Sequence, residues 1–119
     1  MTRVLIVDDQ PLFRRHLHRL LVHAGLEFAG EARDVQEAAG LLEMLRPDLV
    51  VMDVMLPGVN GLEGTRRLKR LAPALRVILL SAYRDSADVF RAAAREVGAE
   101  AFLSKDELDL KVVQAWEAR

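Results

Sequence analysis

Short apolar runs alternate with longer segments of helical periodicity along the whole sequence, and this alternation constrains the fold more than any other feature. The apolar runs lack the alternation of apolar and polar residues that marks a strand with one wet face, so we expect strands buried on both faces of a parallel sheet. The expected strands are Arg3–Val7, Leu49–Met52, Arg76–Leu80 and Ala101–Leu103, with Glu27–Ala32 as a weaker fifth.

The segments between the strands begin and end with residues that favour helix termini. Pro11 suits the first turn of a helix that stops before Gly25, and Asp34 with Glu37 resembles a capping box. Five strand–helix units joined by right-handed crossovers predict a doubly wound α/β domain. The expected helices are Pro11–Ala24, Asp34–Leu45, Leu62–Leu71, Asp85–Val97 and Asp106–Trp116.

Length and composition fit one globular domain covering residues 1–119. The chain has no cysteine, which excludes disulfides and thiolate metal sites, and its net charge of −1 does not call for nucleic acid or a membrane as a direct partner. The first apolar run is too short for a signal peptide or a membrane span. We therefore expect a cytoplasmic protein.

Five polar residues stand where the expected strands end. Because parallel strands present their carboxyl ends at one edge of the sheet, where doubly wound domains bind ligands, we expect these side chains to meet. Each alone is ordinary for a turn or a solvated surface, but four strands with suitable residues at the same edge indicate a site. The residues are Asp8, Asp9, Asp53, Ser81 and Lys105.

Three carboxylates in one cleft repel one another. At an effective dielectric constant near 20 and separations of about 5 Å, each like-charged pair costs about 3 kcal/mol. Oxygen ligands without His or Cys favour a hard cation such as Mg²⁺, which binds readily together with phosphate. The pattern therefore predicts phosphoryl chemistry, with Asp53 as a nucleophile, Lys105 neutralising phosphoryl charge and Ser81 donating a hydrogen bond.

With these residues, the chain resembles the response-regulator receiver domains of two-component signalling. The segments VDDQPLFR, DVMLPGVNG and AFLSKDEL are most similar to receivers of the NarL/LuxR type. The resemblance implies a flavodoxin-like (βα)5 fold, with five parallel strands in the order 2-1-3-4-5. Such receivers usually precede a helix-turn-helix DNA-binding domain, and we expect no output domain within residues 1–119.

The resemblance also implies a role for each residue of the acidic cluster. Asp53 is the expected phospho-acceptor and a Mg²⁺ ligand, together with Asp9 and the backbone carbonyl of Met55. Asp8 is expected to act on the metal mainly through water.

The remaining matched positions belong to phosphoryl binding and switching. Lys105 is expected to bridge to the phosphoryl group, and Ser81 and Phe102 match the switch hydroxyl and the switch aromatic. Phe102 lacks the hydroxyl of the commoner Tyr, and Asp106 stands where many receivers have Pro.

The function implied is a phosphorylation-dependent switch. A sensor histidine kinase is the expected donor, through its phosphohistidine, and the fourth helix, fifth strand and fifth helix form the face expected to change. That change is expected to control transcription through a DNA-binding domain, and a homodimer formed on phosphorylation is a further expected partner. We expect no enzyme activity beyond Mg²⁺-dependent self-phosphotransfer and slow autodephosphorylation.

Two positions bear on the lifetime of the phosphorylated state. Met55 and Tyr83 lie two residues after Asp53 and Ser81, where receivers of this family flank the path of a hydrolytic water. Neither side chain is a carboxylate or carboxamide that orients water, and both are bulky. We therefore expect slow loss of the phosphoryl group.

Alternative functions fit the sequence less well. A receiver-like interaction domain that no longer uses phosphate does not need the intact acidic cluster. Phosphohydrolases with an Asp nucleophile usually carry a second Asp where Met55 stands. A flavodoxin-like flavin carrier also fits poorly, because the Asp8–Asp9 pair would repel a flavin phosphate.

Two further features have both a structural and a functional interpretation. Three histidines on the first helix, His16, His18 and His23, favour a solvated face over a metal site, although this helix helps to dock the kinase in the family. Trp116 lies on a stripe with Leu108 and Val112, which fits core packing or an interface.

Overall fold

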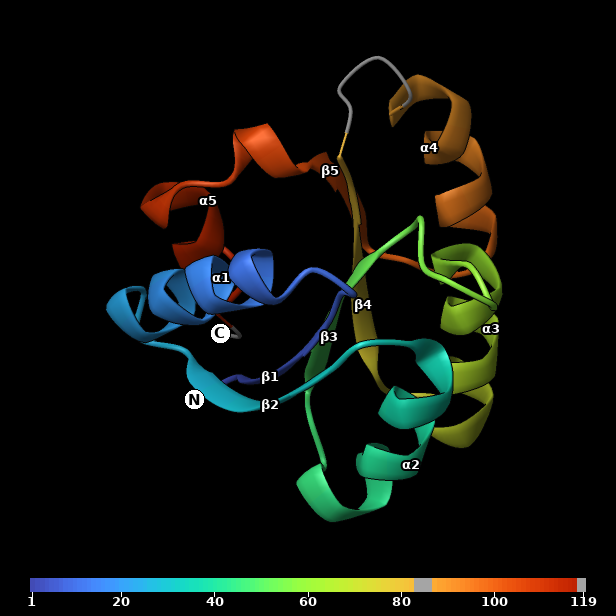
Figure 1. Cartoon of the computed structure of the whole chain (residues 1–119), viewed down its shortest axis with the longest axis horizontal. Helices are drawn as coiled ribbons and strands as arrows, with labels where there is room; N and C mark the ends of the chain where they lie inside the picture. Colours follow the sequence, from blue (N-terminus) through green and yellow to red (C-terminus); the bar gives the residue numbers. More distant parts are fainter. Residues whose placement is uncertain (83–86, 118–119) are drawn as a thin grey trace.

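One parallel sheet with strands in the order β2-β1-β3-β4-β5 forms the centre of the molecule, which confirms the predicted fold class and strand order. The computed structural model describes residues 1–82 and 87–117. Both faces of the sheet are covered by helices (Figure 1). The strands are β1 (Arg3–Val7), β2 (Glu27–Ala32), β3 (Leu49–Asp53), β4 (Arg76–Ser81) and β5 (Ala101–Ser104).

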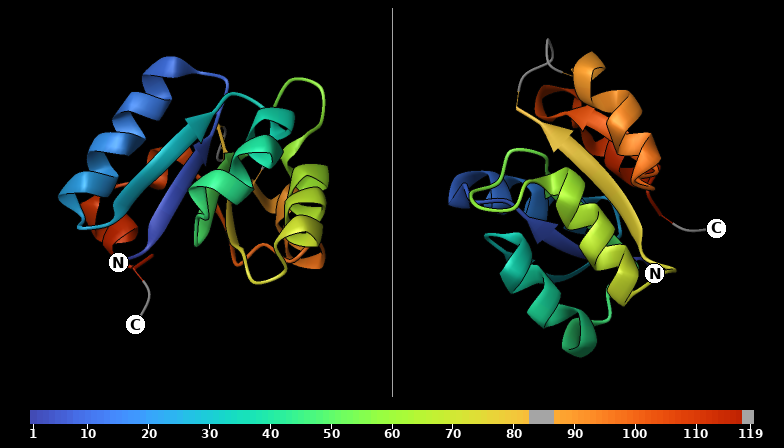
Figure 2. Two further views of the ribbon diagram at one scale, coloured as in Figure 1. Left: turned by 90° about the horizontal axis from the view of Figure 1, so that it is seen from below. Right: turned by 90° about the vertical axis from the view of Figure 1, so that its right-hand side faces the viewer.

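The helices divide between the two faces of the sheet (Figures 1 and 2). On one face, α1 and α5 pack on alternate strand residues such as Ile6, Val51 and Ile78. On the other face, α2, α3 and α4 cover the intervening residues, such as Val50 and Leu79. The helices are α1 (Pro11–His23), α2 (Val35–Leu45), α3 (Gly61–Leu71), α4 (Ala87–Glu96) and α5 (Leu110–Gln114), with a 3-10 turn, η2 (Lys105–Glu107), between β5 and α5.

Three strands extend one residue beyond the predicted apolar runs and end on a polar residue. Asp53 pairs with Leu80, and Ser81 pairs with Ser104, because the backbone ladder continues whatever the polarity of the side chain. The side chains of Asp53 and Ser81 therefore belong to the sheet itself and share its rigidity.

The predicted capping box at the start of α2 forms only in part. Asp34 caps the helix as expected, since its Oδ1 accepts a hydrogen bond from the backbone N of Glu37 at 2.8 Å. The Glu37 carboxylate instead accepts from the backbone N of Arg33 at 3.1 Å. At α4, the predicted start at Asp85 lies outside the described residues.

The last predicted helix, Asp106–Trp116, was wrong in its first part. Residues Lys105–Glu107 form the 3-10 turn η2, and α5 begins only at Leu110. The side chain of Asp109 accepts a hydrogen bond from the backbone N of Val112 at 2.8 Å, and this cap starts a new helix at that point. The sequence pattern joined the turn and the helix into one segment because both are rich in helix-forming residues.

Candidate acidic phospho-acceptor site

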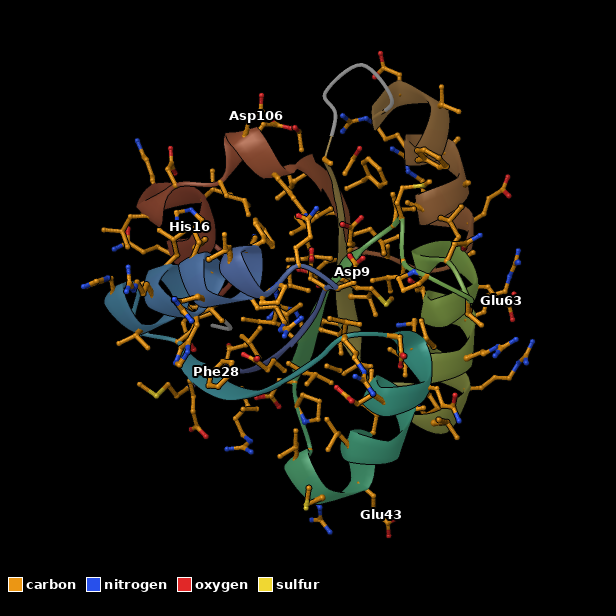
Figure 3. The ribbon with its side chains drawn as sticks, viewed as in Figure 1. Asp9, His16, Phe28, Glu43, Glu63 and Asp106 are labelled. Carbon is orange, nitrogen blue, oxygen red and sulfur yellow. The ribbon has the colours of Figure 1, made fainter. Side chains whose placement is uncertain are left out.

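Three aspartates meet at the carboxyl edge of the two central strands. Asp8 and Asp9 directly follow β1, and Asp53 ends the neighbouring β3. One carboxylate oxygen from each lies within 4.8 Å of the others, with Asp8 and Asp53 buried and Asp9 exposed. Asp9 lies in the turn between β1 and α1 (Figure 3). The structure thus brings together the cluster that the sequence predicted.

Lys105 links two of these carboxylates. Its Nζ lies 2.7 Å from Oδ2 of Asp8 and 2.9 Å from Oδ2 of Asp53, and the lysine side chain is 11% exposed. Lys105 reaches the site from the turn after β5, so residues from three strand ends converge on one point. A single ammonium group thus forms ion pairs with both buried carboxylates.

Burial and ion pairing set the charge of the cluster. Burial raises the pKa of Asp8, against the opposing effect of its hydrogen bonds with Lys105 and the backbone N of Gln10. Burial lowers the pKa of Lys105, but its hydrogen bonds to Asp8 and Asp53 outweigh that effect and raise the pKa overall. Lys105 is therefore an ammonium at neutral pH.

The cluster carries more negative than positive charge. When all three aspartates are ionised, the Lys105 ammonium balances one of three carboxylates and leaves two in excess. An oxygen-only donor set with this excess charge fits a divalent hard cation such as Mg²⁺. The site has the chemistry of a magnesium site.

Backbone groups orient the two buried carboxylates. The backbone N of Met55 donates to Oδ1 of Asp53 at 2.8 Å, and the backbone N of Gln10 donates to Oδ1 of Asp8 at 2.8 Å. Each aspartate thus directs its other oxygen toward Lys105. The Arg14 guanidinium also donates to the Asp8 carbonyl at 2.6 Å, which links α1 to the loop after β1.

The predicted switch residues lie on the two strands that follow β3 in the sheet. Ser81 is buried at the end of β4, on the strand beside Asp53. Phe102 is buried on β5 and stacks on Phe90 of α4, with ring centroids 6.1 Å apart. Met55, whose backbone N contacts Asp53, is 64% exposed. Tyr83, the second predicted hydrolysis-tuning residue, lies outside the described residues.

Phe13 and Gln10 also belong to the site, although sequence reasoning did not place them there. The Lys105 Nζ lies 4.1 Å from the centroid of the Phe13 ring and 3.4 Å from Oε1 of Gln10. The sequence alone shows Phe13 only as an apolar residue within the expected helix Pro11–Ala24. The sequence signal for a role in the site was its place in the first helical turn after Asp8 and Asp9, because that turn begins at the carboxyl end of β1.

The histidines of α1 and Trp116 each had a structural and a functional interpretation, and the contacts of His18 and Trp116 are structural. Among residues 1–82 and 87–117, the aspartate cluster is the only group of three or more metal-ligating side chains, and His18 stacks on Phe28 with ring centroids 3.7 Å apart. Trp116 is buried in the core beneath α1. Core packing of Trp116 is therefore confirmed.

Comparison with known proteins defines the class. The family model described as "Response regulator receiver domain" matches residues 4–117. The chain is 40% identical over 115 residues to "Protein CcdB" of Bacillus subtilis, covering 97% of this chain and 94% of that protein. It is 36% identical over 116 residues to "Response regulator GacA" of Pseudomonas viridiflava, covering 97% of this chain and 53% of that protein. The chain belongs to the family of response-regulator receiver domains.

Solved structures agree with this assignment. The signal receiver domain of the putative response regulator NarL from Mycobacterium tuberculosis superimposes with a TM-score of 0.82 at 32% identity, covering 96% of this chain and 90% of that chain. Receiver domains of this family are phospho-acceptor modules of two-component signalling. Across the described parts of the chain, no helix combines the length and the apolar character needed to cross a membrane.

Proposed function

We propose that this chain is a phosphorylation-controlled switch in which Asp53 accepts a phosphoryl group from the phosphohistidine of a sensor histidine kinase in the cytoplasm. The observation that carries the proposal is the Lys105 ammonium, which bridges Asp53 and Asp8 inside a cluster of three carboxylates. A lysine that is mostly shielded from water beside the acceptor is the partner that a new phosphoryl dianion requires.

In the proposed reaction, an oxygen of the Asp53 carboxylate attacks phosphorus and forms an acyl phosphate. The phosphorus–nitrogen bond to histidine breaks, and its electron pair stays on the imidazole nitrogen. The backbone N of Met55 holds Oδ1 of Asp53 and the Lys105 ammonium holds Oδ2, so the carboxylate is fixed in place before the reaction.

The metal would be held by the acidic cluster. Asp9, Asp53 and the backbone carbonyl of Met55 are the proposed direct ligands, and Asp8 the ligand through water. Mg²⁺, when bound, neutralises charge on the carboxylates and the transferred phosphoryl group. The oxygen-only donor set and the unbalanced charge of the cluster support this assignment.

The proposed output is a change of the α4-β5-α5 face. Ser81 donates a hydrogen bond to a phosphoryl oxygen, and Phe102 adjusts its packing against Phe90 in response. The rearranged face then controls an output, in our proposal transcription through a DNA-binding domain, with homodimer formation as one route.

Intact-mass spectrometry after incubation with acetyl phosphate and Mg²⁺ tests the acceptor. We expect a gain of ~80 Da, the mass of one phosphoryl group, in the wild type and in the control Asp109→Ala, and no gain in Asp53→Ala. Removing Mg²⁺ with EDTA is expected to abolish the gain. An unmodified wild type, or a modified Asp53→Ala, contradicts the proposal and favours a phosphate-independent interaction domain.

A further inference from the structure

An aromatic ring forms one wall of the space that holds the Lys105 ammonium. The Nζ lies 4.1 Å from the centroid of the Phe13 ring, well within the range of a cation–π contact. The same Nζ lies 2.7 Å and 2.9 Å from the carboxylates of Asp8 and Asp53. Two anions and the negative face of a ring thus surround a cation that is mostly shielded from water.

Phe13 is a rigid element of this arrangement. It lies in the first turn of α1, directly after the acidic loop, and is half-buried against the core cluster beneath that helix. A half-buried ring on a helix has few rotamers available, whereas a lysine side chain is long and flexible. The ring therefore limits where the lysine tip can go.

The backbone of Lys105 is held separately. The backbone N of Ser104 donates to the Glu107 carboxylate at 2.8 Å, and the Ser104 hydroxyl donates to Asp106. These contacts close the 3-10 turn that Lys105 opens. The turn determines where the lysine side chain starts, and Phe13 lies where the side chain ends.

We propose that Phe13 is a positioning residue that aims the Lys105 ammonium at the phosphoryl group received by Asp53. The inference rests on the proposed function, because the aim of Lys105 matters for phosphoryl transfer only if Asp53 is the acceptor. A ring face attracts a cation without demanding one hydrogen-bond direction. Lys105 keeps this contact while its hydrogen bonds move from the Asp53 carboxylate to a phosphoryl oxygen.

The contact itself is tested by NMR without any phosphorylation. The chain has only three lysines, Lys69, Lys105 and Lys111, so ¹³C-labelled lysine gives a simple spectrum that Lys→Arg variants assign. We expect the ring current of Phe13 to shift the Lys105 ε-methylene protons upfield. Phe13→Leu is expected to abolish the shift, whereas the control Phe28→Leu retains it.

Phe28 is a matched control for the loss of a ring. It is half-buried against the same core cluster as Phe13, but its ring stacks on His18 and lies on β2 (Figure 3). A general loosening of this cluster affects both variants equally. A loss of lysine positioning affects only Phe13→Leu.

The consequence for phosphoryl transfer is tested by the rate of Asp53 phosphorylation at varied acetyl phosphate. We expect Phe13→Leu to lower the maximal rate about fivefold, with little change in the half-saturating concentration, and Phe28→Leu to match the wild type. Progressive fluorination of the ring at position 13 keeps its shape but withdraws charge from its face, so the rate should fall stepwise.

Each of the following outcomes overturns the inference: an unshifted Lys105 signal in the wild type, a wild-type rate in Phe13→Leu, or equal losses in Phe13→Leu and Phe28→Leu. Flat rates across the fluorinated series also contradict it, because shape alone then explains the role of the ring. A shifted Lys105 signal in a wild type that accepts no phosphoryl group shows instead that the contact exists and the proposed function has failed.

Discussion

At the level of single residues, Lys105 makes two buried carboxylates compatible with a folded core. Asp8 and Asp53 are almost fully buried, and unpaired charges at such positions are strongly destabilising. One ammonium within hydrogen-bond distance of both offsets much of that cost. In the proposed function, phosphorylation of Asp53 would redistribute contacts of this ammonium that already exist.

Met55 is the residue that we expect to tune the lifetime of the phosphorylated state. Its side chain is 64% exposed beside Asp53 and offers no group that orients water. Met55→Asn adds an amide able to make one hydrogen bond to the attacking water, worth about 1 kcal/mol, and so should shorten the lifetime about fivefold. The lifetime is measured by mass spectrometry, as the loss of the ~80 Da adduct over time.

The control for this prediction is Met44→Asn. Met44 is 73% exposed on α2, so the substitution makes the same chemical change outside the site. We expect it to leave the lifetime unchanged. If Met55→Asn loses its phosphoryl group no faster than Met44→Asn, the proposed role of Met55 is wrong.

At the level of elements, the start of α3 approaches the end of β3 too closely for any side chain to fit between them. A Cβ placed on Gly61, the first residue of α3, would lie 2.6 Å from the carbonyl oxygen of Asp53 and 2.8 Å from the Cα of Val54. The backbone N of Gly61 also donates to the carbonyl of Val54 at 2.9 Å. The loop after Asp53 is therefore tied to the start of α3.

Gly61→Ala is expected to destabilise the protein by about 1–3 kcal/mol, because the clash involves backbone atoms that cannot rotate away. Gly40→Ala is the matched control: Gly40 lies inside α2, and a Cβ placed on it would meet no atom within 4 Å apart from the neighbouring backbone of the helix. This change is expected to stabilise the protein by about 0.5–1 kcal/mol. Urea denaturation measures both. Changes of the same sign in the two variants would refute the close approach.

At the level of the whole molecule, Thr2 and the residues that follow α5 are joined at the amino edge of the sheet, opposite the acidic site. The backbone N of Thr2 donates to the Glu117 carboxylate at 2.8 Å, and Arg76 donates to the carbonyl of Trp116 at 2.9 Å. These bonds hold Trp116 in the core beneath α1. The short helix α5 therefore depends on tertiary contacts, since five residues do not form a stable helix alone.

Trp116→Ala is expected to lower the free energy of unfolding by about 3–5 kcal/mol, because it leaves a cavity between α1 and the sheet. Leu71→Ala, at an exposed position, is expected to change it by less than about 0.5 kcal/mol. Urea denaturation must be followed by circular dichroism, because Trp116 is the only tryptophan. Similar stabilities of the two variants would show that Trp116 does not support the core.

The sequence by itself determined the layer architecture and the residues at the edge of the sheet. Runs such as Leu49–Met52 are short and apolar at every position, and this local pattern favours a strand covered on both faces. Asp8, Asp9, Asp53, Ser81 and Lys105 then meet because parallel strands end at the same edge. The strand order followed from resemblance to the receiver family.

Only the tertiary structure decided which side chains touch. The contact of Phe13 with Lys105, the bridge from Lys105 to Asp8 and the approach of Gly61 to Asp53 join segments that are distant along the chain or separated by a loop. The break between η2 and α5 depended on the cap at Asp109 and on burial of Trp116. Periodicity describes one segment at a time, whereas these contacts depend on how several segments pack together.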